Sequence, residues 1–90
     1  MDLEMVPPEV LELVSLTELN LDHNHLSNLP QAISNLTRLR RLYVADNQVS
    51  FLPSEIGKLR NLEVLNLSEN VLSALPVELG NCIALSLIHI

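Results

Sequence analysis

The sequence predicts a solenoid of the α/β repeat class, in which each turn of the chain adds one strand to a narrow parallel β-sheet. Turns, 3-10 segments or short helical segments are expected to close each coil on the opposite, convex side. Four prolines follow one another at intervals of 23 residues, three asparagines keep the same step, and apolar residues recur at fixed places between them. A fixed period of 20 to 50 residues is typical of stacked repeats that bury one continuous core.

The 23-residue step divides the chain into three full repeats, 16–38, 39–61 and 62–84. Residues 1–15 are the second half of an earlier repeat, in which Val10 and Leu13 align with core residues, and residues 85–90 begin a further one. Because open ends of a solenoid expose core leucines and a strand edge, we expect a fragment of a longer repeat protein. Residues 86–90 also resemble the translation of a sequencing adapter, a hypothesis that amplification of the genomic locus would test.

Each recurring residue type has a physical role. The pattern LxxLxL at the start of every repeat has the period of a half-buried strand. The asparagine that follows can satisfy backbone groups where the chain turns inward, so the asparagines are expected to form a ladder between coils. Proline fixes φ and lacks an N–H, which suits the start of the convex turn. The expected structural residues are Asn24, Asn47, Asn70, Pro30, Pro53 and Pro76, with Gly57 and Gly80 at exposed corners.

The apolar positions of each repeat are expected to form the core. Positions 1, 4, 6, 11, 14, 18 and 21 are leucine, isoleucine or valine in every full repeat, except that Cys82 replaces a leucine. Position 14 includes Leu75 in the third repeat. A lone cysteine at a core position is read as a small buried apolar residue rather than as a reactive thiol.

The remaining strand positions, numbered 2, 3, 5, 7 and 8 in each repeat, are predicted to face the concave side of the sheet. Tyr43 is the expected anchor for a partner, because tyrosine and arginine are enriched at binding hot spots; the alternative is a tyrosine that lies passively over the sheet. The other expected partner-binding residues are Glu18, Asn20, Asp22, Arg40, Arg41, Asp46, Glu63, Asn66 and Glu69.

Two pairs of opposite charges lie in neighbouring repeats of this surface. Glu18 is expected beside Arg41, and Arg40 beside Glu63. These side chains either read the charges of a partner or, as we favour, pair with each other across the strands for roughly 0.2–1 kcal/mol each. The acidic residues at positions 7 and 8 would form an acidic edge, which favours a partner with basic groups.

Composition and motifs exclude several functions. A net charge of −6 argues against a nucleic-acid partner, since phosphate binding needs a surplus of Lys and Arg. A single cysteine excludes a disulfide framework and a four-ligand cysteine site for zinc. His23 and His25 flank a predicted ladder residue and are read as exposed neighbours, not as metal ligands. We therefore expect no catalytic residues, metal, cofactor, membrane span or small-molecule substrate, and a cytoplasmic location.

The repeats resemble the 23-residue leucine-rich repeats with an LPxxIxxL second half, as in LPQAISNL and LPSEIGKL. Such repeats occur in the Ras-binding leucine-rich repeat scaffolds, in the Scribble and Erbin type of polarity proteins, and in plant intracellular Ras-group repeat proteins. The resemblance covers essentially the whole chain. It implies a leucine-rich repeat solenoid, not an enzyme, that binds a protein such as a small GTPase on its concave face within a signalling scaffold.

Two other readings use the same surface. The chain could be the targeting domain of a larger enzyme of the deadenylase, adenylyl cyclase or ubiquitin ligase type, whose catalytic part lies outside it. It could also be the sensor region of an immune receptor. The domain encoded downstream of Ile90 would separate the three readings.

Overall fold

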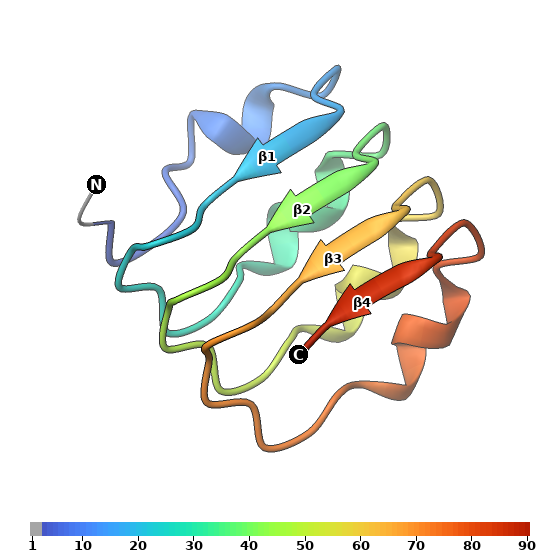
Figure 1. The fold of residues 1–90 in the computed structure, drawn as a ribbon. Helices are drawn as coiled ribbons and strands as arrows, with labels where there is room; N and C mark the ends of the chain where they lie inside the picture. The colour runs from blue at the N-terminus through green and yellow to red at the C-terminus, as the bar shows by residue number, and fades with distance from the viewer. Residues whose placement is uncertain (1–2) are drawn as a thin grey trace.

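The computed structural model describes residues 3–90 as four coils, each contributing one strand to a parallel sheet (Figure 1). The strands are β1 (Glu18–Asn20), β2 (Arg41–Tyr43), β3 (Val64–Asn66) and β4 (Leu87–His89), and they lie in chain order. Neighbouring strands pair with a constant shift of 23 residues, as in Leu19↔Leu42 and Leu42↔Leu65. The predicted parallel sheet and its register are confirmed.

Short 3-10 helices close the coils on the face opposite the strands (Figure 1). Pro30, Pro53 and Pro76 immediately precede three of them, with φ near −70° and extended ψ. Each proline carbonyl accepts the first hydrogen bond of its helix, as in Ile33 N to Pro30 O at 3.1 Å. The helices are η1 (Val10–Glu12), η2 (Gln31–Asn35), η3 (Ser54–Lys58) and η4 (Val77–Asn81).

The core lies between the sheet and the 3-10 helices and is almost entirely aliphatic. In the two central coils the apolar repeat positions are completely or nearly completely buried, from Leu26 after β1 to Leu62 before β3. Burial of a leucine side chain contributes roughly 1.5–3 kcal/mol. The stacked leucines therefore supply the main stabilisation, and they do so between adjacent coils, because no coil buries its own apolar face alone.

The expected asparagine ladder is present. The Asn47 side-chain oxygen accepts from Leu26 N at 3.0 Å, and its Nδ2 donates to the carbonyls of Leu21, Val44 and Ala45. Asn24 and Asn70 bond in the equivalent way, within their own coils and to the preceding segment. The ladder satisfies backbone groups that face the core at the carboxyl ends of the strands.

Gly57 does not lie at an exposed corner, as its sequence context had suggested. It is buried inside η3, and a Cβ built on it would lie 2.5 Å from the Glu78 carbonyl oxygen. The absence of a side chain lets η4 approach η3 closely. Gly80 is exposed and has no atom within 4 Å of such a Cβ, so the expectation holds for that residue alone.

The ends of the solenoid also depart from the predicted core. In the N-terminal half repeat the buried residue of η1 is Leu11, whereas Val10 is only partly buried and Leu13 is 53% exposed. Leu75 in the third repeat is 37% exposed. The sequence pattern marks these positions as core, but full burial requires a coil packed on both sides, and the terminal coils have one neighbour each among the described residues.

Candidate functional site

The face of the sheet turned away from the 3-10 helices, here called the concave face, carries the residues that the sequence predicted for partner binding. The strands themselves are shorter than expected and cover only positions 3 to 5 of each repeat. Position 2 precedes the strand, and positions 7 and 8 lie beyond it. The concave face therefore has three parts along the strand direction: an amino end, a central row and a carboxyl end.

At the amino end, the predicted cross-strand pairs form. Arg40 Nε donates to Glu63 Oε2 at 2.8 Å, and Arg40 Nη2 lies 2.7 Å from the same oxygen. Arg41 Nη1 lies 3.7 Å from Glu18 Oε1, a looser contact in which the carboxylate is more exposed than that of Glu63. These four side chains pair with each other, as favoured from the sequence. Thr17, Glu18, Arg40 and Arg41 line a hollow of about 200 Å³.

The central row consists of the strands' last residues. Asn20, Tyr43 and Asn66 are aligned in register across β1, β2 and β3, and His89 continues the row on β4. Tyr43 is half-buried, and no hydrogen bond joins its hydroxyl to residues 3–90. Asn20 Oδ1 accepts from Asp22 N at 2.9 Å, and Asn66 Oδ1 accepts from Ser68 N at 3.0 Å. The amides are thereby held in fixed orientations.

At the carboxyl end, position 8 of each repeat has a left-handed backbone, with φ of 60° at His23, 56° at Asp46 and 57° at Glu69. This conformation turns the chain from the strand into the buried asparagine. None of the three residues is glycine; aspartate and histidine are enriched in this conformation, so the strain is expected to be greatest at Glu69. Sequence reasoning missed this feature, although the residue directly before each ladder asparagine could have been suspected of making the turn.

Side chains at the carboxyl end also bond between coils. His23 Nδ1 lies 2.8 Å from Asp46 Oδ2, with both side chains exposed. Asp22 Oδ1 accepts from Ala45 N at 2.7 Å. Glu69 makes no hydrogen bond or ion pair with residues 3–90. Of the three carboxylates in the expected acidic edge, those of Asp22 and Asp46 interact with the neighbouring coil, and that of Glu69 has no partner within residues 3–90.

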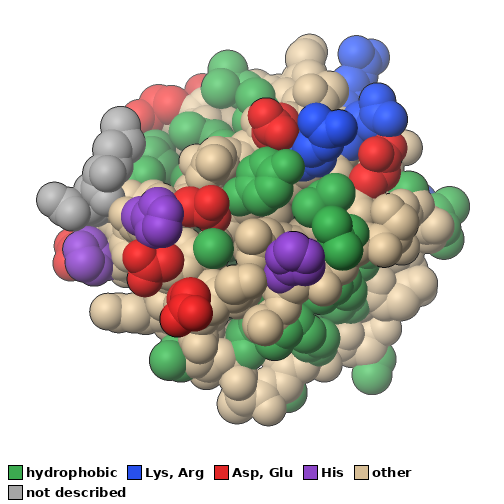
Figure 2. Space-filling view, in the orientation of Figure 1, with side chains coloured by type: hydrophobic (Ala, Val, Ile, Leu, Met, Phe, Trp, Pro, Cys, Tyr) green, Lys and Arg blue, Asp and Glu red, His purple; other side chains and the backbone are tan. Residues whose placement is uncertain are grey.

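Along the strand direction, the amino end of the concave face carries charges of both signs, whereas the carboxyl end carries acidic side chains (Figure 2). Arg40 and Arg41 lie at the amino ends of the strands, beside the acidic residues with which they pair. The acidic residues Asp22, Asp46 and Glu69 follow the carboxyl ends. In Figure 2 the blue side chains gather at one side of the sheet with red ones beside them, and further red side chains lie toward the other side.

The remaining candidates do not form a chemical site within residues 3–90. Cys82 is buried, its Sγ–H donates to Ile56 O at 3.2 Å, and burial raises the pKa of the thiol. No group of three or more His, Cys, Asp or Glu in this range is placed to hold a metal ion. None of its helices is long and apolar enough to cross a membrane.

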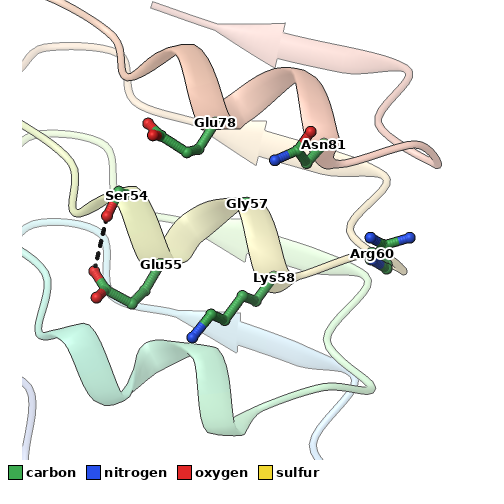
Figure 3. A pocket seen from close by; sticks show the side chains of 7 residues that line it. All are labelled: Ser54, Glu55, Gly57, Lys58, Arg60, Glu78 and Asn81. Atoms are coloured by element: carbon green, nitrogen blue, oxygen red, sulfur yellow. Dashed lines mark hydrogen bonds between the residues drawn. The ribbon is translucent and has the colours of Figure 1, made fainter.

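A hollow of about 420 Å³ lies on the convex side between η3 and η4 (Figure 3). Glu55 and Glu78 line it together with Lys58, Arg60 and Asn81. Glu55 is turned toward Ser54 Oγ, at 3.4 Å, while Lys58 extends away from the hollow toward η2 (Figure 3). Charges of both signs therefore line this hollow without converging on one point.

Comparisons with known proteins agree with the fold. A leucine-rich repeat family model matches residues 2–49, and a model of two leucine-rich repeats matches residues 37–81. A leucine-rich repeat protein of Leptospira interrogans has a similar structure, with a TM-score of 0.82 and 34% sequence identity. That match covers 96% of this chain and 22% of the Leptospira protein.

A second similar structure is the leucine-rich repeat ectodomain of the membrane receptor kinase GASSHO1/SCHENGEN3 from Arabidopsis thaliana, solved in complex with Casparian Strip Integrity Factor 2. Its TM-score is 0.79 at 32% identity, over 92% of this chain and 10% of the ectodomain chain. Curated protein sequences gave no significant match. The family models together span almost all of the sequence, and the chain belongs to the leucine-rich repeat family.

Proposed function

We propose that the chain is a protein-interaction module that binds a protein partner on its concave face, as part of a cytoplasmic signalling scaffold. The central row carries the proposal. Tyr43 lies on β2, the middle one of the first three strands, and its hydroxyl makes no hydrogen bond with residues 3–90. It lies between the arginines of the amino end and the acidic residues of the carboxyl end. An accessible tyrosine near charged groups has the composition of a binding hot spot.

Two further points support this function. Leucine-rich repeat domains are generally protein-interaction modules, and one similar structure was solved in complex with a named factor. Small GTPases are the first partner class to test, because the LPxxIxxL repeats resemble those of the Ras-binding scaffolds. A partner held by Tyr43 and the charged ends would bind with on-rates that fall as salt rises.

Site-specific crosslinking tests the proposal in cells. A photo-crosslinking phenylalanine analogue is placed at Tyr43 on the concave face or at Lys58 on the convex side, both in the full chain. We expect light-dependent adducts with a discrete protein from position 43 and none from position 58. The double variant Tyr43→Ala, Arg41→Glu should abolish capture of that protein without unfolding the repeat domain.

The matched control is Lys58→Glu with Arg60→Ala, which changes charge on the convex side and should leave capture intact. Adducts formed only from position 58, or full capture by the concave double variant, would reject the concave face as the binding surface.

A further inference from the structure

We infer that the partner contributes an extended stretch of main chain that crosses the strands of the concave face. Two of its carbonyl oxygens accept hydrogen bonds from the side-chain amides of Asn20 and Asn66, on either side of Tyr43. This inference rests on the proposed function, because it specifies what the same face binds, and it identifies the partner segment by its backbone chemistry.

The two amides are oriented by the protein itself. Asn20 Oδ1 faces the N–H of Asp22, and Asn66 Oδ1 faces both the N–H and the hydroxyl of Ser68. An atom that faces a backbone N–H must be the amide oxygen, so the nitrogen of each amide points elsewhere. No hydrogen bond joins either Nδ2 to a residue in 3–90. The central row therefore presents two fixed donor groups that have no acceptor within residues 3–90.

The spacing of these donors matches an extended ligand. Asn20 is in register with Tyr43, and Tyr43 with Asn66, so the two amides are two strands apart. Strands lie about 4.8 Å apart, which separates the donors by about 9.6 Å. A polyproline II segment repeats every three residues, or about 9.3 Å, and places one carbonyl on the same side in each turn. Carbonyls of residues i and i+3 can thus meet both donors at once.

The chemistry of the row also selects against a helical partner. In a helix the carbonyls are already used internally, and only the last four lack partners. A polyproline II segment leaves its carbonyls free, and its rings dock on aromatic side chains such as Tyr43. The acidic carboxyl end adds direction: side chains of the segment that lie near Asp46 and Glu69 should be basic.

The test uses a substitution that keeps the shape of the side chain but replaces the NH₂ donor with a negatively charged oxygen. In Asn20→Asp, Asn66→Asp a carboxylate can still accept the same backbone N–H, but the NH₂ group becomes an acceptor. The matched control, Asn35→Asp with Asn81→Asp, makes the same chemical change at exposed ends of η2 and η4. Two libraries are panned on the wild-type chain: random linear 12-residue peptides, and a three-helix scaffold with a randomised helix face.

We expect proline-rich linear binders whose Kd rises at least tenfold on the Asn20→Asp, Asn66→Asp variant and stays within twofold on the control. The loss should persist in 0.5 M NaCl, where charges are screened beyond about 4 Å. An amide-to-ester scan of one binder, which weakens single carbonyl acceptors, needs no protein variant. It should weaken binding at two positions three residues apart.

The contrary outcomes separate the two proposals. In one contrary outcome, linear peptides stop binding to Tyr43→Ala, Arg41→Glu, but neither the aspartate variant nor the ester scan weakens their binding. That result would overturn the amide contacts and leave the concave face as the binding surface. The amide contacts would also be overturned if the only binders sensitive to concave substitutions came from the helical library. Binders indifferent to every concave substitution, or none from either library, would overturn the proposed binding function itself.

Discussion

Gly57 in η3 packs directly on the backbone of Glu78 in η4, so that a methyl group at Gly57 would lie 2.5 Å from the Glu78 carbonyl oxygen and 2.9 Å from its Cβ. The backbone atoms of Glu78 cannot move aside without shifting the whole coil. We expect Gly57→Ala to lower the free energy of unfolding by roughly 1–3 kcal/mol, the usual range for overpacking. Urea denaturation followed by circular dichroism measures it.

Gly80 supplies the matched control, because it holds the same position in the next coil and a Cβ added to it would have nothing within 4 Å. Gly80→Ala should be neutral or stabilise by about 0.4–1 kcal/mol, since alanine loses less backbone entropy on folding. Equal effects of the two substitutions would show that the close approach of η4 to η3 does not constrain Gly57.

Substitution of different asparagines in the ladder should lower the free energy of unfolding by different amounts. Asn47 and Asn70 each make four side-chain hydrogen bonds, but Asn47 is only 7% exposed while Asn70 is partly open to water. Leaving buried backbone groups unpaired costs about 1–3 kcal/mol for each. We expect Asn47→Ala to cost roughly 3 kcal/mol or more, and Asn70→Ala clearly less. Thermal unfolding of both variants at equal concentration measures the difference.

The left-handed residue Glu69 offers a route to stabilisation. It makes no interaction with residues 3–90, and its φ of 57° strains a side chain with a Cβ. Asparagine tolerates this conformation well, so Glu69→Asn should raise the free energy of unfolding by about 0.5–1 kcal/mol. Glu69→Ala removes the same carboxylate without relieving φ and should give no gain. If alanine raised the free energy of unfolding as much as asparagine does, the effect would come from removal of the charge and not from relief of φ.

The two ion pairs at the amino end should differ in strength. Arg40 and Glu63 are 2.7 Å apart, whereas Arg41 and Glu18 are 3.7 Å apart, and Glu18 is more exposed than Glu63. Double-mutant cycles with alanine should give a coupling of about 0.5–1 kcal/mol for the first pair and near zero for the second. Both couplings should shrink in 1 M NaCl. A larger coupling for Arg41 and Glu18 would contradict the geometry.

The buried thiol of Cys82 predicts an alkaline loss of stability. Burial raises the pKa of Cys82, so the folded state holds this proton more tightly than the unfolded state does. The contribution is fully present below the ordinary thiol pKa of about 8.5 and is lost as pH rises through the raised folded value. The unfolding midpoint should therefore fall more steeply with rising pH in the wild type than in Cys82→Val. Parallel pH profiles would refute the linkage.

The period of the sequence was sufficient to predict the parallel sheet, its 23-residue register and the ladder, because Asn24, Asn47 and Asn70 repeat with the leucines. The period of the sequence could not predict features that depend on the distances between coils. The packing role of Gly57 depends on the distance to Glu78, and the exposure of Leu75 depends on the neighbours of the last coil.

The candidate site was predictable to a similar extent. Alternation along each strand placed Tyr43 in a row with Asn20 and Asn66, and the pairing of Arg40 with Glu63 followed from the repeat length. The orientation of the two amides was not predictable, because it depends on hydrogen bonds to backbone groups two residues further along the chain. The left-handed residues were not predictable either, because none of them is glycine, the residue type that usually indicates this conformation.

The constant 23-residue shift between strands has a consequence for how such a chain can change its length. The side-chain hydrogen bonds between coils join residues 21 to 26 positions apart, as in Asn47 to Leu26 and Asn47 to Leu21, so that none skips a coil. Removal of residues 39–61 would set Leu62 on Leu16 and Asn70 beside Leu26, with every stacking partner replaced by its equivalent. The same deletion would remove Tyr43 and both flanking arginines. A single in-frame recombination event can therefore remove the centre of the recognition surface while the architecture that displays it is conserved.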